Sequence, residues 1–200
     1  MTGRIAAGLA ALALAGCGGG GEVATTVTVT QPETVTEAVT VTEPSMPETA
    51  CSTSGLRIVL PQEADLPAAV AETRRRIFEA AIACDYDALQ AVALDGEPGF
   101  TYSYGGETSA ADFWRGAEER DGRPLAILVQ ILAMPHTRNE AGFYAWPAAY
   151  SEHPTVEAWN DLEAVYSRDE INAWREFGSY LGYRVGITPA GEWQFFVAGD

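Results

Sequence analysis

The sequence predicts a single α+β domain in which N-terminal helices pack on a mostly antiparallel sheet that ends in a β-hairpin. Early in the folded region, apolar residues recur every three or four positions, which is the period of an amphipathic helix. Residues 183–197 instead alternate apolar and polar side chains on either side of a turn, which is the period of strands. Residues 51–200 contain all five Trp, all eight Tyr and all seven Phe, enough for one core.

The first predicted helix spans residues 65–84 and is followed by a shorter one. Arg74–Arg76 lie off its apolar stripe and are interpreted as a solvated face, because a charge run on a helix usually faces water. Asp85 or Asp87 is expected to cap the second helix, which carries Leu89, Val92 and Leu94. The apolar stripe of the first helix consists of Leu66, Val70, Ile77, Ala81 and Cys84.

The sequence of residues 100–146 predicts three strands and one helix. Aromatic residues alternate with small polar ones in residues 100–104, which favours a half-buried strand. Ser109 is expected to cap a helix over residues 110–120. The apolar run 125–134 is interpreted as a buried strand, and residues 143–146 as another after a polar loop.

Two helices and a hairpin are expected at the C-terminal end. After Pro154, the apolar spacing up to Tyr166 favours a helix. Ser167 and Glu170 form a capping-box pattern that opens the next one, with an inner face reaching Leu181. Residues 183–187 and 193–197 then form the hairpin.

The N-terminus carries an export signal. Arg4 precedes an apolar run from Ile5 to Ala15, which is too short for a bilayer core that needs roughly 20 residues. Leu14-Ala15-Gly16-Cys17 resembles the lipobox of bacterial lipoproteins. That resemblance implies removal of residues 1–16, a diacylglycerol on Cys17, and an extracytoplasmic protein anchored to the bacterial cell membrane. The alternatives are an ordinary signal peptide and an uncleaved anchor.

Residues 17–50 are expected to form a disordered tether between the lipid and the domain of residues 51–200. The segment is rich in Thr, Val, Glu and Pro and contains no aromatic residue to bury. The whole chain carries a net charge of −16, and loss of Arg4 with the signal makes the mature chain more negative still. Because nucleic-acid affinity depends on basic contacts to phosphates, no nucleic acid is expected to bind.

Cys51 and Cys84 are predicted to form a disulfide after export, since disulfides persist outside the cytoplasm. The alternative is two unpaired thiols, with Cys84 packed in the core. No metal is expected. The cysteine pair lacks the close Cys or His neighbours that zinc needs, and His136 and Glu140, four residues apart, lie in a turn-forming stretch. No cofactor is expected either, because no Gly-rich phosphate loop follows a strand.

The order of elements resembles the NTF2-like superfamily. The resemblance is carried by the stretch 83–89, by Phe113-Trp114 and by the closing residues 191–195, and residues 155–181 depart from it by reading as helical. It implies a cone-shaped domain with an apolar pocket, for which Tyr102, Tyr104 and Trp114 are the candidate lining residues. The C-terminal residues also resemble uncharacterised bacterial secreted domains.

These observations favour a cell-envelope domain that binds a small apolar ligand or an envelope protein without catalysis. No nucleophile motif is present, and the carboxylate pairs at helix starts are explained by capping. The alternative is an enzyme in which Asp85 or Asp87, Tyr102 and His136 converge in an NTF2-like pocket. A structural or accessory envelope subunit is the third interpretation.

Overall fold

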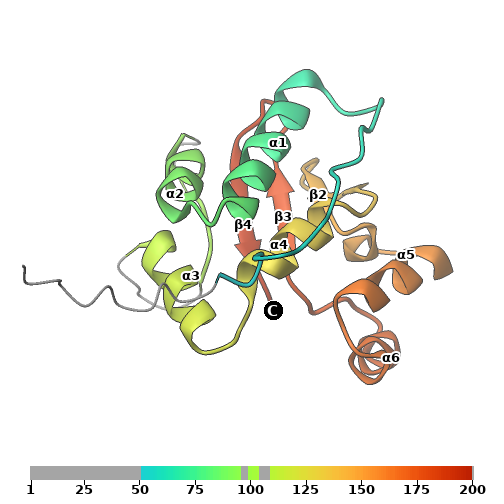
Figure 1. Ribbon diagram of the computed structural model, residues 1–200. Coiled ribbons are helices and arrows are strands. Elements are labelled where there is room, and N and C mark those ends of the chain that lie inside the picture. Colours follow the sequence, from blue (N-terminus) through green and yellow to red (C-terminus); the bar gives the residue numbers. More distant parts are fainter. Residues whose placement is uncertain (1–50, 96–98, 104–108, 200) are drawn as a thin grey trace, which may run out of the picture. The chain divides into compact units, whose positions relative to one another are not determined.

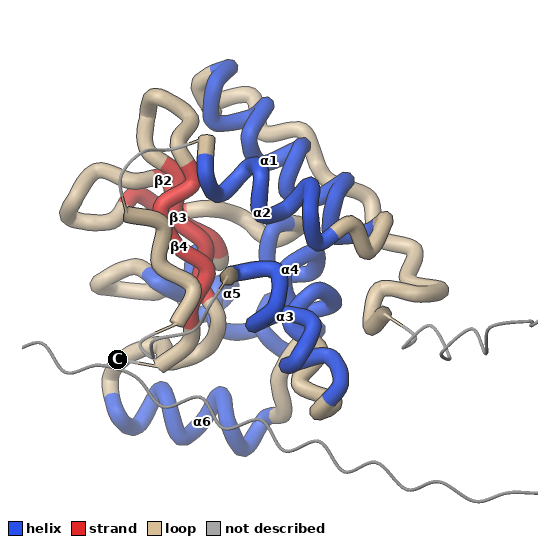
Figure 2. Tube along the Cα trace, turned by 90° about the vertical axis from the view of Figure 1, so that its left-hand side faces the viewer, coloured by secondary structure: helices blue, strands red, loops and turns tan. Residues whose placement is uncertain are grey.

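The computed structural model describes residues 51–95, 99–103 and 109–199, so the expected signal and tether lie outside the described residues. The described chain is an α+β domain, as predicted. A single sheet forms one layer, and four helices lie against one of its faces (Figures 1 and 2). These helices are α1 (Ala68–Ile82), α2 (Tyr86–Leu94), α3 (Ala110–Glu119) and α4 (Pro124–Leu132).

The sheet is antiparallel throughout, and its strands follow one another in chain order. Its strands are β1 (Thr137–Arg138), β2 (Tyr144–Trp146), β3 (Arg184–Ile187) and β4 (Trp193–Val197). The predicted C-terminal hairpin is β3 and β4, with Val185 opposite Phe196. Its turn packs on α1, where Thr73 Oγ1 donates to the carbonyl of Gly191 at 2.5 Å. A Cβ at Gly191 would lie 2.8 Å from the carbonyl oxygen of Ala69, so the close approach requires glycine.

Most predicted helix starts are confirmed by their caps. The side chains of Asp85 and Ser109 accept hydrogen bonds from backbone N–H groups of the first turn of α2 and α3. The capping box of Ser167 and Glu170 opens α6 (Arg168–Phe177), which ends at Gly178 in the left-handed conformation. The helix predicted after Pro154 is α5 (Val156–Asp161), continued by the 3₁₀ turn η2 (Leu162–Ala164).

The prediction of a strand over residues 125–134 is wrong, because this run forms α4. Pro124 occupies the first helical position, where its missing N–H costs nothing. Leu125, Leu128, Ile131 and Leu132 are all fully buried, since α4 lies between α1, α3 and the sheet. A helix buried on most sides shows no amphipathic period, so its sequence cannot be told from a buried strand by periodicity.

The strand predicted at residues 100–104 is reduced to a single bridge in its described part. Thr101 pairs in parallel with Phe195 on β4, and its N–H donates to Gln194 O at 2.8 Å. Phe100 and Tyr102 have their rings 6.1 Å apart, with both next to Trp114. Tyr104 lies outside the described residues.

The N-terminal end of the described chain is bound to the helices by a disulfide and a buried carboxylate. Cys51 and Cys84 are bonded, which confirms the predicted pairing. Next to them, Glu118 accepts hydrogen bonds from the N–H and hydroxyl of Ser52, at 2.8 and 2.7 Å. Across the described part of the chain, none of the helices has the length and apolarity required to traverse a bilayer.

Candidate functional site

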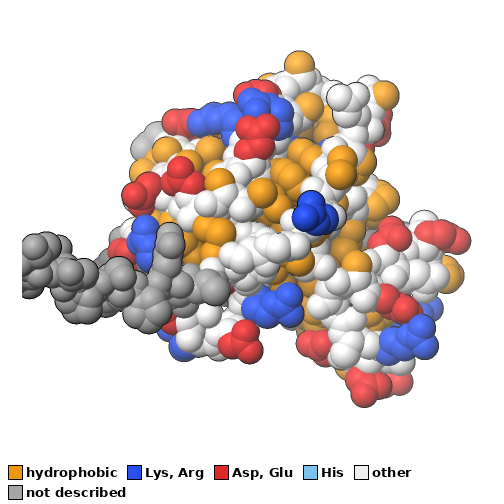
Figure 3. Space-filling view, viewed as in Figure 1, with side chains coloured by type: hydrophobic (Ala, Val, Ile, Leu, Met, Phe, Trp, Pro, Cys, Tyr) orange, Lys and Arg blue, Asp and Glu red, His pale blue; other side chains and the backbone are white. Residues whose placement is uncertain are grey.

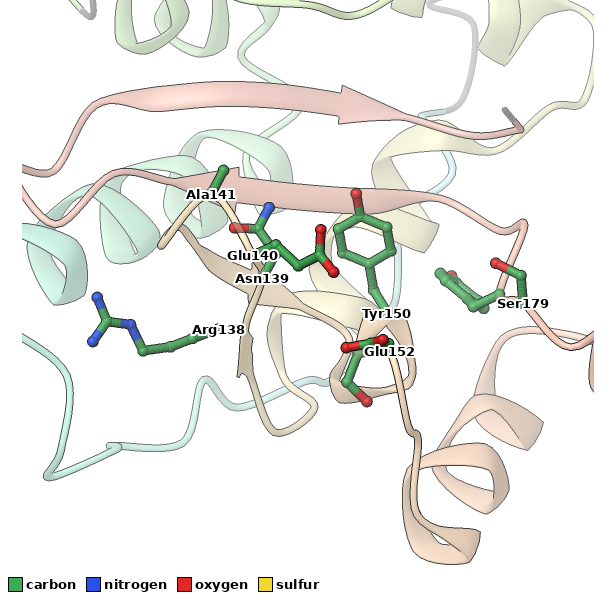
Figure 4. Close-up of a pocket in the computed structure, with 9 residues that line it drawn as sticks. Arg138, Asn139, Glu140, Ala141, Tyr150, Glu152 and Ser179 are labelled. Carbon is green, nitrogen blue, oxygen red and sulfur yellow. The ribbon is translucent and has the colours of Figure 1, made fainter.

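A polar cavity of about 540 Å³ lies beside Tyr150, between the β1–β2 turn and the link from α6 to β3 (Figure 4). We call it the Tyr150 pocket. Three separate segments line it: the β1–β2 turn, the 3₁₀ turn η1 (Ala148–Tyr150) with the residues after it, and the link between α6 and β3. The lining residues are Arg138, Asn139, Glu140, Ala141, Tyr150, Ser151, Glu152, Ser179 and Tyr180.

Local hydrogen bonds fix the shape of this pocket. In the β1–β2 turn, Asn139 Oδ1 accepts from the N–H of Phe143 at 2.9 Å, and Gly142 takes a positive φ. On the opposite wall the Tyr180 hydroxyl donates to Tyr183 O at 2.6 Å. Burial raises the pKa of Tyr180 well above its ordinary value, so this wall is neutral over the physiological pH range.

Contacts with Arg184 and Phe195 fix the aromatic ring of Tyr150 at the pocket. The guanidinium of Arg184 lies 5.1 Å from the Tyr150 ring centroid, and the ring of Phe195 meets it edge-on at 6.2 Å. Arg184 itself is buried and donates to the carbonyl of Gly199. The ring therefore has little freedom to leave the pocket.

The charges at the Tyr150 pocket are predominantly acidic. Glu140 and Glu152 are exposed residues that line the pocket together with Tyr150 (Figure 4). The guanidinium of Arg138 extends away from them, because it lies over Tyr144 at 4.9 Å and donates to Gly142 O at 3.2 Å. Among the described residues, no arginine forms an ion pair with either carboxylate, and the contact of Glu152 with His153 is 4.0 Å long.

A second hollow is a groove of about 710 Å³ between residues 60–66 and α1. Its walls include Leu60, Pro61, Leu66 and Ala71, and Figure 3 shows hydrophobic side chains gathered on this face. Its apolar walls suit the apolar ligand or protein partner expected from the sequence. All of its lining, however, comes from the single stretch 60–75.

The pocket residues predicted from the sequence lie elsewhere. Trp114 is fully buried and stacks on Trp193 with ring centroids 5.7 Å apart, so it is a core residue rather than the wall of an open pocket. Its indole N–H finds no acceptor among the described residues. Tyr102 packs against Phe113 at 5.6 Å, and Tyr104 lies outside the described part of the chain.

The residues of the alternative enzyme site do not converge. His136 directly precedes β1 at one edge of the sheet, whereas Tyr102 follows the bridge to β4 at the other edge. Four inter-strand spacings of about 4.8 Å, from β1 across the sheet to the segment paired with β4, separate the two by roughly 19 Å. Asp85 is used as the cap of α2, and Asp87 pairs with Arg115 at 3.2 Å.

His136 instead belongs to a cluster that brings together parts of the chain far apart in sequence. This His136 cluster consists of Glu63, Asp65, Arg74, His136 and Trp146. Glu63 is its centre, because its carboxylate is hydrogen-bonded to His136 Nδ1 and, at 3.3 Å, to the Trp146 indole, and forms an ion pair with Arg74 Nη2 at 2.8 Å. Asp65 Oδ2 lies 3.6 Å from His136 Nε2.

Arg74 corrects the prediction of a solvated arginine face. Its side chain is only 2% exposed and lies over the Trp146 ring at 5.2 Å, whereas Arg75 is 48% exposed. Burial lowers the pKa of Arg74, opposed by the charge of Glu63, but a guanidinium remains protonated. Burial also favours a higher pKa for Glu63, yet the hydrogen bond from His136 and the charge of Arg74 outweigh it, so the pKa of Glu63 is lowered.

Sequence reasoning missed this cluster because its members are separated along the chain. Glu63 and His136 are 73 residues apart, and Glu63 precedes the first helix in a stretch without periodicity. The signal that was available, a histidine next to the start of a strand, does not identify its partner.

Comparison with known proteins identifies no family for this chain. No family model matches the chain, and no curated protein or solved structure is detectably similar to it.

Proposed function

We propose that this chain is an extracytoplasmic lipoprotein whose domain binds a small, positively charged ligand carrying an amine or ammonium group in the Tyr150 pocket. The observation that carries the proposal is the pair of carboxylates, Glu140 and Glu152, beside a fixed tyrosine ring in a cavity of about 540 Å³. This volume lies in the usual range for small-molecule sites.

The ligand chemistry follows from the lining. Unpaired carboxylates accept charge-assisted hydrogen bonds from an ammonium group. The guanidinium of Arg184 already lies over the Tyr150 ring, so the carboxylates rather than the ring supply the attraction for a cation. The same carboxylates repel anions, and the overall net charge of −16 strengthens that repulsion. A polar lining also disfavours the small apolar ligand expected from the sequence.

We assign the ligand to the Tyr150 pocket rather than to the groove along α1. The pocket gathers polar groups from three segments, and convergence of this kind is typical of ligand sites. The groove is built by residues 60–75 alone, and Glu63 and Arg74 of its lining already pair with each other.

The ligand proposal is tested by calorimetric titration with choline and with glucosamine, using acetate as the anionic comparison. Monovalent amines are chosen because a polyamine would bind any acidic surface. Binding of at least one amine, and none of acetate, is expected. Glu140→Gln should weaken binding by up to about 5-fold, since Glu140 is exposed and an exposed charge pair contributes up to about 1 kcal/mol.

Glu176→Gln is the matched control. The substitution removes the same charge, and Glu176 is exposed on α6 and is not part of the pocket lining. It should leave the Kd unchanged. The proposal fails if neither amine binds, or if Glu140→Gln and Glu152→Gln both bind as tightly as the original chain.

The lipid anchor is supported by Leu14-Ala15-Gly16-Cys17 after a short apolar run, and the Cys51–Cys84 disulfide is compatible with an oxidising compartment. Cys17→Ser should shift the protein from the membrane fraction to the soluble fraction, because the acyl chains that hold it are lost. A variant that still sediments entirely with membranes would contradict the anchor.

A further inference from the structure

We infer that His136 and Asp65 bind a divalent transition-metal ion of the zinc type, with Glu63 as the positioning residue for His136. This site is separate from the Tyr150 pocket, and its test does not depend on the amine ligand.

The first step is the fixed orientation of the imidazole. His136 is only 10% exposed, with its ring centroid 5.5 Å from that of Tyr144 and 5.6 Å from that of Trp146. Its Nδ1 is hydrogen-bonded to the Glu63 carboxylate. An ionised carboxylate only accepts hydrogen bonds, so Nδ1 is the donor, and in the tautomer protonated at Nδ1 the lone pair available to a metal is that of Nε2. A carboxylate on the second ring nitrogen is the usual arrangement around metal-bound histidines.

The second step is the distance between the two donor atoms. His136 Nε2 and Asp65 Oδ2 are 3.6 Å apart, which is too long for a hydrogen bond. Two ligands held at about 2.1 Å from one tetrahedral ion lie roughly 3.4 Å apart. The observed spacing therefore fits an ion between the two atoms, and the side chain of Asp65, 75% exposed, is free to make the small adjustment.

The third step is the charge around the site. Arg74 binds Glu63 through Oε1, whereas His136 binds it through Oε2, so the guanidinium charge is already matched by Glu63. Among the described residues, no arginine pairs with the carboxylate of Asp65, which faces His136 Nε2. Donor atoms from Glu63, Asp65 and His136 all lie within 4.8 Å of one another. Imidazole and carboxylate donors suit zinc and its neighbours, and the solvent side supplies the other coordination positions.

The experiment measures thermal unfolding of the full exported chain, carrying Cys17→Ser so that no free thiol competes, with and without Zn²⁺. At about a hundredfold excess over Kd, Zn²⁺ should raise Tm by about 5 to 10 °C. His136→Asn keeps a donor for Glu63 at the position of Nδ1 but removes the Nε2 ligand. Asp65→Asn removes the carboxylate at an exposed position. Both variants should lose the Zn²⁺-dependent rise in Tm.

His153→Asn is the matched control, because His153 is the other histidine of the chain and its side chain is 90% exposed. It should keep the full rise. If Asp65→Asn or His136→Asn retains the rise, or if the original chain shows none, the site does not bind metal and His136 only bridges two carboxylates.

Glu63→Gln distinguishes positioning from simple structural support. As a positioning residue, Glu63 should affect the Zn²⁺ Kd of the folded protein, with a weakening of about 10- to 100-fold. A purely structural role would lower Tm in the absence of metal and leave that Kd unchanged.

Discussion

At the scale of single residues, Arg74 is a charged side chain that is buried in the core. Its Nε and Nη2 donate to the carbonyl of Leu132 at 3.0 and 2.5 Å, and its Nη1 donates to Pro61 O at 2.9 Å. Leu132 is the last residue of α4, so its carbonyl has no partner within the helix. Arg74 thus satisfies the end of α4, neutralises Glu63 and holds residues 61–63 on the domain.

Replacing Arg74 by Met should therefore destabilise the domain strongly. The change removes the cationic partner of Glu63 and the donor to the carbonyl of Leu132, and loss of one partner of a buried pair costs about 3 to 5 kcal/mol. Because Glu63 is 16% exposed, the lower end of this range is expected. Urea unfolding gives the free energy of unfolding directly.

Arg75→Met provides the comparison. Arg75 pairs with Glu72 and Glu79 on the helix surface, where such pairs contribute about 0 to 1 kcal/mol. Equal losses of unfolding free energy for Arg74→Met and Arg75→Met would contradict the structural role of Arg74.

The contrast between these two arginines marks the limit of sequence reasoning at the residue scale. The helical stripe through Val70 and Ile77 was predicted, and both are fully buried. Arg74 lies at the border of that stripe, and whether a border residue is covered depends on where α4 and residues 61–63 arrive. The same holds for His136, whose partners come from a loop that no local pattern connects to it.

At the scale of elements, the start of α4 is built by side chains from two other segments. Arg123 takes a left-handed conformation, and Pro124 has no N–H to satisfy. The next two N–H groups donate at 3.0 Å to Glu118 Oε1 and to the Ser52 hydroxyl. A carboxylate at this end also interacts favourably with the helix dipole.

Glu118→Ala should lower the free energy of unfolding by about 2 kcal/mol, because it removes the acceptor for the N–H of Leu125 and for Ser52 in a buried place. Chemical denaturation is the measurement. Glu119→Ala is the control, since Glu119 is exposed and surface changes usually stay within about 0.5 kcal/mol. A loss for Glu118→Ala as small as that of the control would refute the capping role.

Elements with their own terminal signals were predicted well, and elements defined by tertiary contacts were not. Ser109 and the Ser167–Glu170 box identified helix starts because a cap is a local interaction. The residues of α4 were assigned to a strand because burial on most sides hides the helical period. The bridge at Thr101 depends on β4, nearly a hundred residues later, and alternation alone overstated its length.

At the scale of the whole molecule, a disulfide joins the N-terminal segment of the described chain to the helices. The bond between Cys51 and Cys84 ties this segment to the end of α1. Thr53 reinforces this junction, since its hydroxyl donates to Ala81 O at 3.1 Å.

The disulfide between Cys51 and Cys84 should stabilise the domain against unfolding. The bonded cysteines are 33 residues apart, and closing such a loop reduces the entropy of the unfolded chain by an amount worth about 3 to 4 kcal/mol. Reduction, or the double change Cys51→Ser with Cys84→Ser, should lower Tm by about 6 to 15 °C in a domain of this size. Cys17→Ser, which removes a cysteine outside the junction, should leave Tm unchanged under oxidising conditions. Calorimetric scans of the three forms decide the matter: coincident transitions with and without reductant would mean that the helices and sheet hold the N-terminal segment without the bond.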